Sequence, residues 1–129
     1  MEMKKIIQGS RHADVTFHQD GRIDLTAHVV KTLDLHEGDV INIAELGERY
    51  PEHYIYVARR AINATGRHSG ICRPVKRGGN YQRVYSKCLT DYILHRCQAS
   101  ESQALRVGAP TQLTGIGQAL PLIMPHKKP

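Results

Sequence analysis

The dipeptide Asp20-Gly21, which separates two short runs of alternating residues, is the feature that most restricts how this chain can fold. Asp-Gly supplies the positive φ angles that a tight hairpin turn needs. Before the turn, Val15–His18 predicts a short strand. After it, Arg22–Thr26 places Ile23 and Leu25 on one face, which is typical of a strand with one buried side. The sequence therefore predicts a β-hairpin near its start.

The hydrophobic period changes directly after this hairpin. The spacing of the apolar residues predicts a short helix over Ala27–Leu33, with Thr26 as its N-cap. A turn follows in which Gly38 can adopt a left-handed conformation. Two further strands are expected at Val40–Ala44, which is rich in β-branched residues, and at His53–Ala58, with a polar loop over Leu46–Pro51 between them.

This order of strand, Asp-Gly turn, strand, helix, Gly-Asp turn and strand resembles the swapped-hairpin β-barrel of the SpoVT/AbrB family of transition-state regulators and antitoxins. The resemblance covers about residues 15–60. The segments that carry it are Gly21-Arg22-Ile23, Thr32-Leu33-Asp34-Leu35, Glu37-Gly38-Asp39 and Val40-Ile41-Asn42-Ile43.

The resemblance implies a homodimer, because one half-barrel of this size leaves its apolar face open and two copies must interleave to cover it. It also implies that basic side chains of the dimer contact DNA. Two residues of this chain occupy basic positions of the family pattern and would share this role, Arg22 after the hairpin glycine and Lys31 near the end of the helix. Arg22 could equally be a surface residue paired with Asp20 or Asp24. The chain is then divided into a dimerisation region at 1–60 and a basic extension at 61–129.

The extension is expected to contain loops, short strands and one helix. Arg59–Gly79 predicts loops, because glycine and proline interrupt it repeatedly, with strands at Ile71–Val75 and, beyond it, Tyr81–Tyr85. Ser86 is expected to cap a helix of about Lys87–Ala99, whose buried stripe would contain Leu89, Tyr92, Ile93 and Arg96 or Cys97.

The C-terminal part is expected to consist of strands and bends. A polar hinge at Gln98–Gln103 leads to apolar segments at Leu105–Val107 and Leu113–Met124, and the second of these contains two glycines and a proline. With the elements predicted before them, these segments give the fold class as α+β, a small AbrB-like half-barrel followed by a mixed extension.

Charge is spread unevenly along the chain. The formal net charge is +6. Residues 1–52 carry six Lys and Arg against ten Asp and Glu, whereas residues 53–100 carry nine Lys and Arg against Asp91 alone. A surface of one sign concentrates polyanions by long-range attraction, so this asymmetry favours an anionic partner.

The cations of the second part lie among small residues, with Tyr81 and Tyr85 between them. Cations on accessible loops suit backbone phosphates, and tyrosine rings offer faces on which unpaired bases can stack. The candidate nucleic-acid-binding residues, in addition to Arg22 and Lys31, are Arg59, Arg60, Arg67, Arg73, Lys76, Arg77, Arg83 and Lys87.

Other chemistries find less support in the sequence. Three widely spaced cysteines, Cys72, Cys88 and Cys97, do not form a disulfide framework, which favours a reduced, cytoplasmic protein. His68 with Cys72, and His95 with Cys97, could each supply a pair of zinc ligands, but Cys-x-x-Cys is absent. No metal, cofactor or catalytic residue is therefore predicted. No apolar run suits a membrane span or a secretory signal.

The sequence therefore predicts a non-enzymatic, homo-oligomeric protein that binds nucleic acid, most simply DNA, mainly through phosphate contacts. One alternative is a structural protein, for example a phage or mobile-element component. There the acidic first part of one copy would meet the basic second part of the next. Another is an antitoxin-like module whose segment Leu105–Met124 docks on a protein partner.

Overall fold

The computed structural model describes residues 13–47, 51–58, 70–71, 73–74 and 81–125, and at residues 70–74 the description is limited to the backbone. These ranges form one ten-stranded sheet and two helices. The strands are β1 (Val15–His18), β2 (Arg22–Leu25), β3 (Val40–Leu46), β4 (Glu52–Val57), β5 (Gly70–Ile71), β6 (Arg73–Pro74), β7 (Gln82–Tyr85), β8 (Ser102–Val107), β9 (Thr111–Leu113) and β10 (Gly117–Ile123). The helices are α1 (Ala27–Leu33) and α2 (Lys87–Cys97).

The predicted N-terminal hairpin is confirmed. Strands β1 and β2 pair antiparallel around a turn in which Gly21 has a φ of 101°. The buried positions of β2 are Ile23 and Leu25, as its alternation indicates. Helix α1 has the predicted bounds, and Gly38 has a φ of 91°. Thr26 stands at the N-cap, but its hydroxyl donates to the carbonyl oxygen of Asp14 at 3.2 Å and does not cap the helix.

All the strand pairs are antiparallel, and they join the two parts of the chain into one sheet. Its order is β5-β3-β4-β10-β8-β1-β2-β7-β6, with β9 paired to β10 outside this path. Strands β10 and β8, from the C-terminal part, therefore lie between β4 and β1 of the N-terminal part. The segment Leu105–Met124 is thus mostly a structural part of the sheet.

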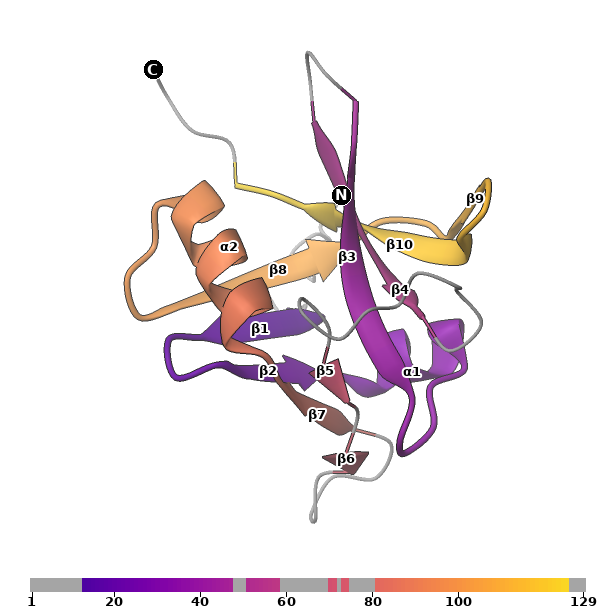
Figure 1. Ribbon diagram of the computed structural model, residues 1–129, viewed down its shortest axis with the longest axis horizontal. Coiled ribbons are helices and arrows are strands. Elements are labelled where there is room, and N and C mark those ends of the chain that lie inside the picture. The colour runs from indigo at the N-terminus through magenta and orange to yellow at the C-terminus, as the bar shows by residue number, and fades with distance from the viewer. Residues whose placement is uncertain (1–12, 48–50, 59–69, 72, 75–80, 126–129) are drawn as a thin grey trace, which may run out of the picture.

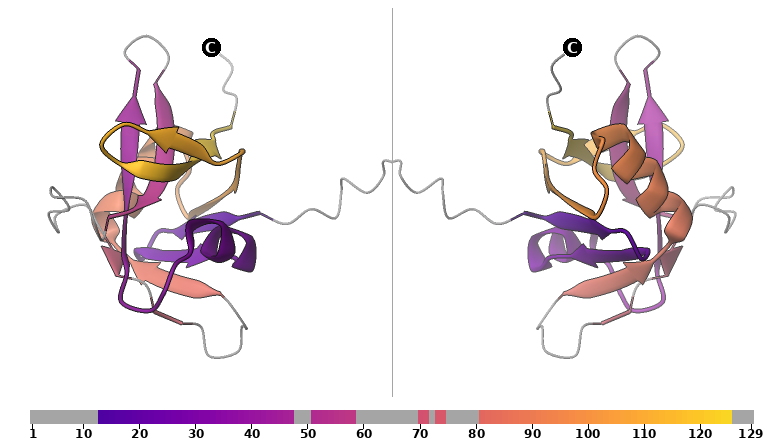
Figure 2. Two further views of the ribbon diagram at one scale, coloured as in Figure 1. Left: turned by 90° about the vertical axis from the view of Figure 1, so that its right-hand side faces the viewer. Right: turned by 90° about the vertical axis from the view of Figure 1, so that its left-hand side faces the viewer.

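The sheet curls on itself because its two outermost strands are neighbours in the sequence. One residue separates β5 from β6, yet β5 pairs with β3 and β6 pairs with β7. This short stretch brings the two ends of the sheet near each other, and β5 contacts β7. In Figures 1 and 2, β3 consequently crosses β1 and β2 at a steep angle. The fold is α+β, a curled antiparallel sheet with two helices.

The core lies inside this curl. It joins fully buried residues of β1, β2 and β7, among them Phe17, Ile23 and Val84, to Ile41 of β3 and Ile55 of β4. Helix α2 contacts β1, β2 and β8 (Figure 1), and α1 contacts β2 and β10. One side of the sheet formed by β8, β1, β2 and β7 therefore faces the core.

The structure refines the predicted helix α2. Its Ser86 cap is confirmed, since Ser86 Oγ accepts a hydrogen bond from the Leu89 amide at 3.2 Å. The helix ends at Cys97 rather than Ala99, because Gln98 adopts a left-handed conformation. The buried stripe consists of Leu89, Thr90, Ile93, Leu94 and Cys97, whereas Tyr92 is half-buried and Arg96 is exposed.

Other boundaries also differ from those predicted, by one residue at an end of β2, β4 and β7 and by more in the strands that follow here. Strand β3 continues to Leu46 because β4 pairs with it along its length, up to Glu52. Strand β8 begins at Ser102, within the expected hinge, because Ser102 pairs with His18 of β1. The strand expected over Ile71–Val75 is observed as β5 and β6, and Val75 lies outside the described residues.

Candidate nucleic-acid interface

The side of β8, β1, β2 and β7 that faces away from the core is here called the outer face. Strand alternation assigns residues to it, because neighbours of buried positions point to the opposite side of the sheet. Register then places them in two rows across the strands. One row is Ala104, Thr16, Asp24 and Arg83, and the other is Ser102, His18, Arg22 and Tyr85.

Asp24 lies between two of the predicted cations on this face. Its Oδ1 is 2.8 Å from Nε of Arg83, and its Oδ2 is 3.4 Å from Nε of Arg22. The two arginine side chains remain 36% and 35% exposed, respectively. One carboxylate thus holds two guanidinium groups that are 61 positions apart in the sequence. The three side chains together carry one net positive charge.

His18 and Tyr85 extend this cluster on either side. His18 Nε2 lies 3.1 Å from Asp24 Oδ2 and 3.2 Å from a terminal nitrogen of Arg22. The pKa of the Arg83 guanidinium is raised, first by its hydrogen bond to Asp24 and in smaller part by the Tyr85 hydroxyl, while desolvation opposes the rise. The cluster therefore fixes both guanidinium groups on the outer face while leaving part of each accessible.

The other two candidate cations with described side chains lie away from this cluster. Lys87 donates to Asp91 at 3.0 Å and to the carbonyl oxygen of Gln19 at 3.1 Å, which ties the start of α2 to the β1–β2 turn. Lys31 is exposed in the last turn of α1, a helix that follows β2 at the end opposite to Arg22.

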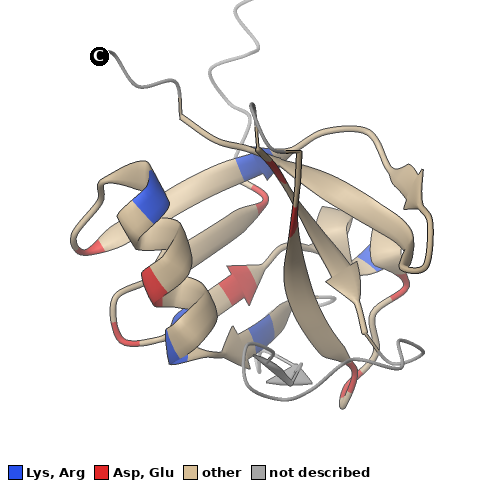
Figure 3. Ribbon diagram, turned by 45° about the horizontal axis from the view of Figure 1, so that its top comes forward, with Lys and Arg blue, Asp and Glu red and all other residues tan. Residues whose placement is uncertain are grey.

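The remaining candidates cannot be placed as side chains. Arg59, Arg60, Arg67, Lys76 and Arg77 lie outside the described residues, and of Arg73 only the backbone is described, opposite Arg83 in the β6–β7 register. Among the described residues, basic and acidic positions alternate around β2, β7 and the start of α2 (Figure 3). The ion pair left open for Arg22 is thus found with Asp24, and three of the four described candidate cations have an aspartate partner.

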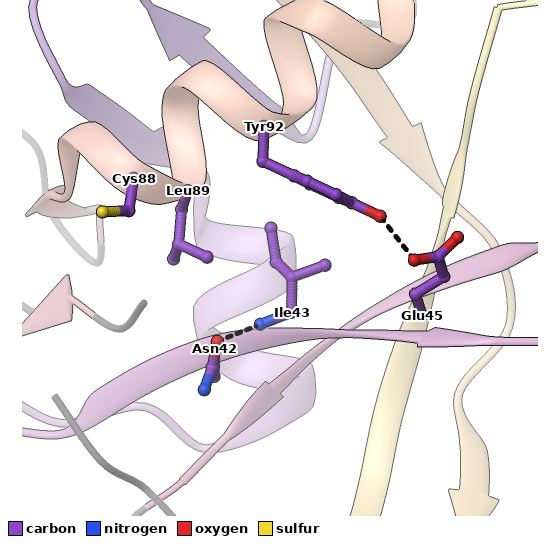
Figure 4. Close-up of a pocket in the computed structure, with 6 residues that line it drawn as sticks. All are labelled: Asn42, Ile43, Glu45, Cys88, Leu89 and Tyr92. Carbon is purple, nitrogen blue, oxygen red and sulfur yellow. Dashed lines mark hydrogen bonds between the residues drawn. The ribbon is translucent and has the colours of Figure 1, made fainter. Parts of the chain in front are cut away.

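A separate pocket of about 340 Å³ lies between β3 and α2. Its lining residues are Asn42, Ile43, Glu45, Cys88, Leu89 and Tyr92 (Figure 4). The polar groups of the pocket are engaged with their neighbours. Tyr92 donates its hydroxyl hydrogen to Glu45 Oε1 at 2.9 Å, and Asn42 Oδ1 accepts from the Ile43 amide at 2.8 Å.

Behind the pocket, the Tyr92 hydroxyl also lies 2.8 Å from Nε2 of the buried His53. Because the hydroxyl donates its one hydrogen to Glu45, it must accept from His53, which assigns the His53 hydrogen to Nε2. Arg96 completes the group, 3.4 Å from Glu45 Oε2 and 5.0 Å from the centre of the Tyr92 ring. Sequence reasoning missed this network, because strands β3 and β4 and helix α2 bring its members together and no local motif joins them.

The pKa of His53 is lowered, mainly by burial, with Arg96 contributing in the same direction and Glu45 opposing. A lowered pKa in the folded state means that the unfolded state binds the proton more readily. The contribution of neutral His53 to the free energy of unfolding should therefore be fully present above the ordinary pKa of 6.5. It should be lost as the pH falls from 6.5 towards the lower pKa of the folded state.

Urea unfolding followed by circular dichroism at pH 8 and pH 5 measures this effect. In His53→Gln, whose amide can still donate to Tyr92, the loss of unfolding free energy between the two pH values should be smaller than in wild type. The other seven histidines are present in both proteins, so their contribution cancels in the comparison. An equal loss in both proteins would show that the pKa of His53 is not lowered in the folded state.

Two of the three cysteines lie in the described part of the chain, both in α2. Cys88 is exposed at the start of α2, and Cys97 is buried. Within the described residues, no three His, Cys, Asp or Glu side chains gather where they could hold a metal ion. His68 and Cys72, one of the two zinc-ligand pairs considered above, lie outside those residues.

Neither helix in the described residues is long and apolar enough to cross a membrane. Comparison with known proteins found no family model, no curated protein and no solved structure that matches this chain.

Proposed function

We propose that this protein binds nucleic acid without catalysing a reaction, and that the outer face around Arg22, Asp24 and Arg83 is part of the contact surface. The observation that carries the proposal is the convergence of Arg22 and Arg83, from strands distant in sequence, on one exposed face. Each guanidinium has five N–H donors, so an ion pair through Nε leaves others for phosphate oxygens.

The charge of the surrounding sequence supports this proposal. Asp24 neutralises one of the two arginines, but residues 53–100, which include Arg83, carry eight more basic than acidic side chains. Arg73 stands opposite Arg83 in the register of β6 and β7. We propose that the candidates outside the described residues add further phosphate contacts, together with Lys87 and Lys31 at the two ends of the surface.

The test is fluorescence anisotropy of the purified chain with a labelled oligonucleotide at several salt concentrations between 50 and 200 mM. Each phosphate neutralised contributes about −0.7 to −0.9 to the slope of log K against log salt. Contacts by Arg22 and Arg83 alone therefore predict a slope of about −1.4 or steeper. Absence of binding at 50 mM salt, to single strands and duplexes alike, would reject the proposal.

The swapped-hairpin dimer implied by the AbrB resemblance belongs to this proposal as its oligomeric form. The matching order of β1, β2, α1 and β3 supports it. In the single chain, β1 pairs with β8 and β2 pairs with β7, so a swapped dimer would replace these pairings with the same pairings between two copies. Light scattering at micromolar concentration should give twice the chain mass of 14.5 kDa, and a monomer would reject the dimer.

A further inference from the structure

We propose that the outer face selects single-stranded over double-stranded nucleic acid, with the Tyr85 ring as a platform on which an unpaired base stacks. This inference rests on the proposed function and names its substrate class. Tyr85 is the last residue of β7 and its side chain is 56% exposed, the most exposed large hydrophobic residue among those described. Its ring therefore has a face available to a ligand.

The position of Tyr85 beside two cations indicates what that partner is. Tyr85 stands directly opposite Arg22 of β2, and directly opposite residues have Cβ atoms about 4.5–5.5 Å apart. Arg83 lies two residues earlier on the same strand, so it shares the face. The Tyr85 hydroxyl contributes to the raised pKa of the Arg83 guanidinium, which indicates that the two side chains lie close together. An aromatic ring with a guanidinium on each of two sides combines base stacking with phosphate contacts, as single-strand binding requires.

The shape of the surface favours a single strand as well. Away from the cluster, the outer face carries the small side chains Thr16, Ser102 and Ala104, so the platform is open, and Arg106 of β8 adds a further cation to it. Reading a duplex requires a helix or a β-ribbon that enters a groove. The two described helices are instead packed on the sheet, and the end of the β3–β4 ribbon carries the acidic residues Glu45 and Glu52, which repel phosphates. Bases inside a duplex are stacked on one another and offer no free face to Tyr85.

The experiment compares a 15-nucleotide oligothymidine, the same length of oligouridine and a mixed-sequence 15-base-pair duplex, all labelled, by anisotropy at 100 mM salt. We expect one of the single strands to bind more tightly than the duplex. Tyr85→Leu should weaken single-strand binding about 5- to 150-fold, the range found for the loss of one stacked base. Tyr85→Phe should retain it. Tyr54→Leu is the matched control, because it makes the same change in β4, which is not part of the outer face.

A spectroscopic readout separates stacking from a change in fold. The chain contains no tryptophan, so Tyr85→Trp introduces a single fluorophore on the outer face. Its emission should be quenched when oligothymidine or oligouridine binds. Equal affinity for duplex and single strands, with Tyr85→Leu unchanged and no quenching, would overturn this inference while the proposed function stands. Absence of binding to all three probes, even at 50 mM salt, would overturn both.

Discussion

The double variant Arg22→Ala/Arg83→Ala is expected to bind a labelled oligonucleotide about 10- to 100-fold more weakly than wild type at 100 mM salt. Two phosphate contacts are lost, and each contributes a released counterion to affinity. The loss should be accompanied by a slope of log K against log salt that is shallower by about 1.4 to 1.8. Removing both partners of Asp24 also leaves its carboxylate to repel phosphates, which places the expected effect towards the upper end of the range.

Thr114→Glu/Gln118→Glu is the matched control for this variant, because it changes the net charge by the same two units at exposed positions of the β9–β10 hairpin, outside the outer face. We expect it to weaken binding less than the double variant. Circular dichroism of both proteins verifies that the sheet is retained. Equal losses in the two variants would show that binding depends on net charge alone, and would remove the outer face from the proposed site.

Replacement of Phe17 by alanine is expected to lower the free energy of unfolding by about 3–5 kcal/mol, as is usual for a buried aromatic residue. Phe17 is fully buried in β1, and β1 lies between β8 and β2 in the sheet. It is also the only phenylalanine of the chain, which has no tryptophan. A domain has only about 5–15 kcal/mol of total stability, so this variant will be close to unfolding.

Urea denaturation followed by circular dichroism measures the change. Tyr85→Ala is the control, because it removes a ring of similar size from the outer face, where solvent already surrounds more than half of it. Its cost should be below about 1 kcal/mol, as for surface substitutions in general. If Phe17→Ala costs no more than Tyr85→Ala, the curled core described above is wrong.

Elements whose signals are local were predicted well. The helix Ala27–Leu33 has the bounds that the sequence indicated, and the hairpin around Gly21 differs only at Thr26, where β2 ends one residue early, because alternation, a positive-φ glycine and a short apolar period act within a few residues. The Ser86 cap is a second example. Thr26 shows the limit of such signals, since the Asp14 carbonyl, 12 positions away, takes its hydroxyl.

The candidate site was predicted only in part, for the same physical reason. Sequence composition marked Arg22, Arg83 and Tyr85 as cationic and aromatic residues suited to nucleic acid, but it could not show that β2 and β7 are neighbours. The pairing of these strands places Asp24 directly opposite Arg83. It thereby turns a basic segment into an arginine cluster that is partly neutralised within the same chain.

By itself, the sequence determined the approximate positions of most short strands and of both helices, which faces of them are apolar, and that the middle of the chain is basic. Only the tertiary structure decided the order of the ten strands. Which strands pair depends on which pairing buries their apolar faces in a common core, and a single strand does not carry that information. That order sets two arginines and a tyrosine on one open face, and it buries His53 against Tyr92. Neither arrangement has a counterpart in the linear spacing of residues, since each exists only once distant strands share a sheet.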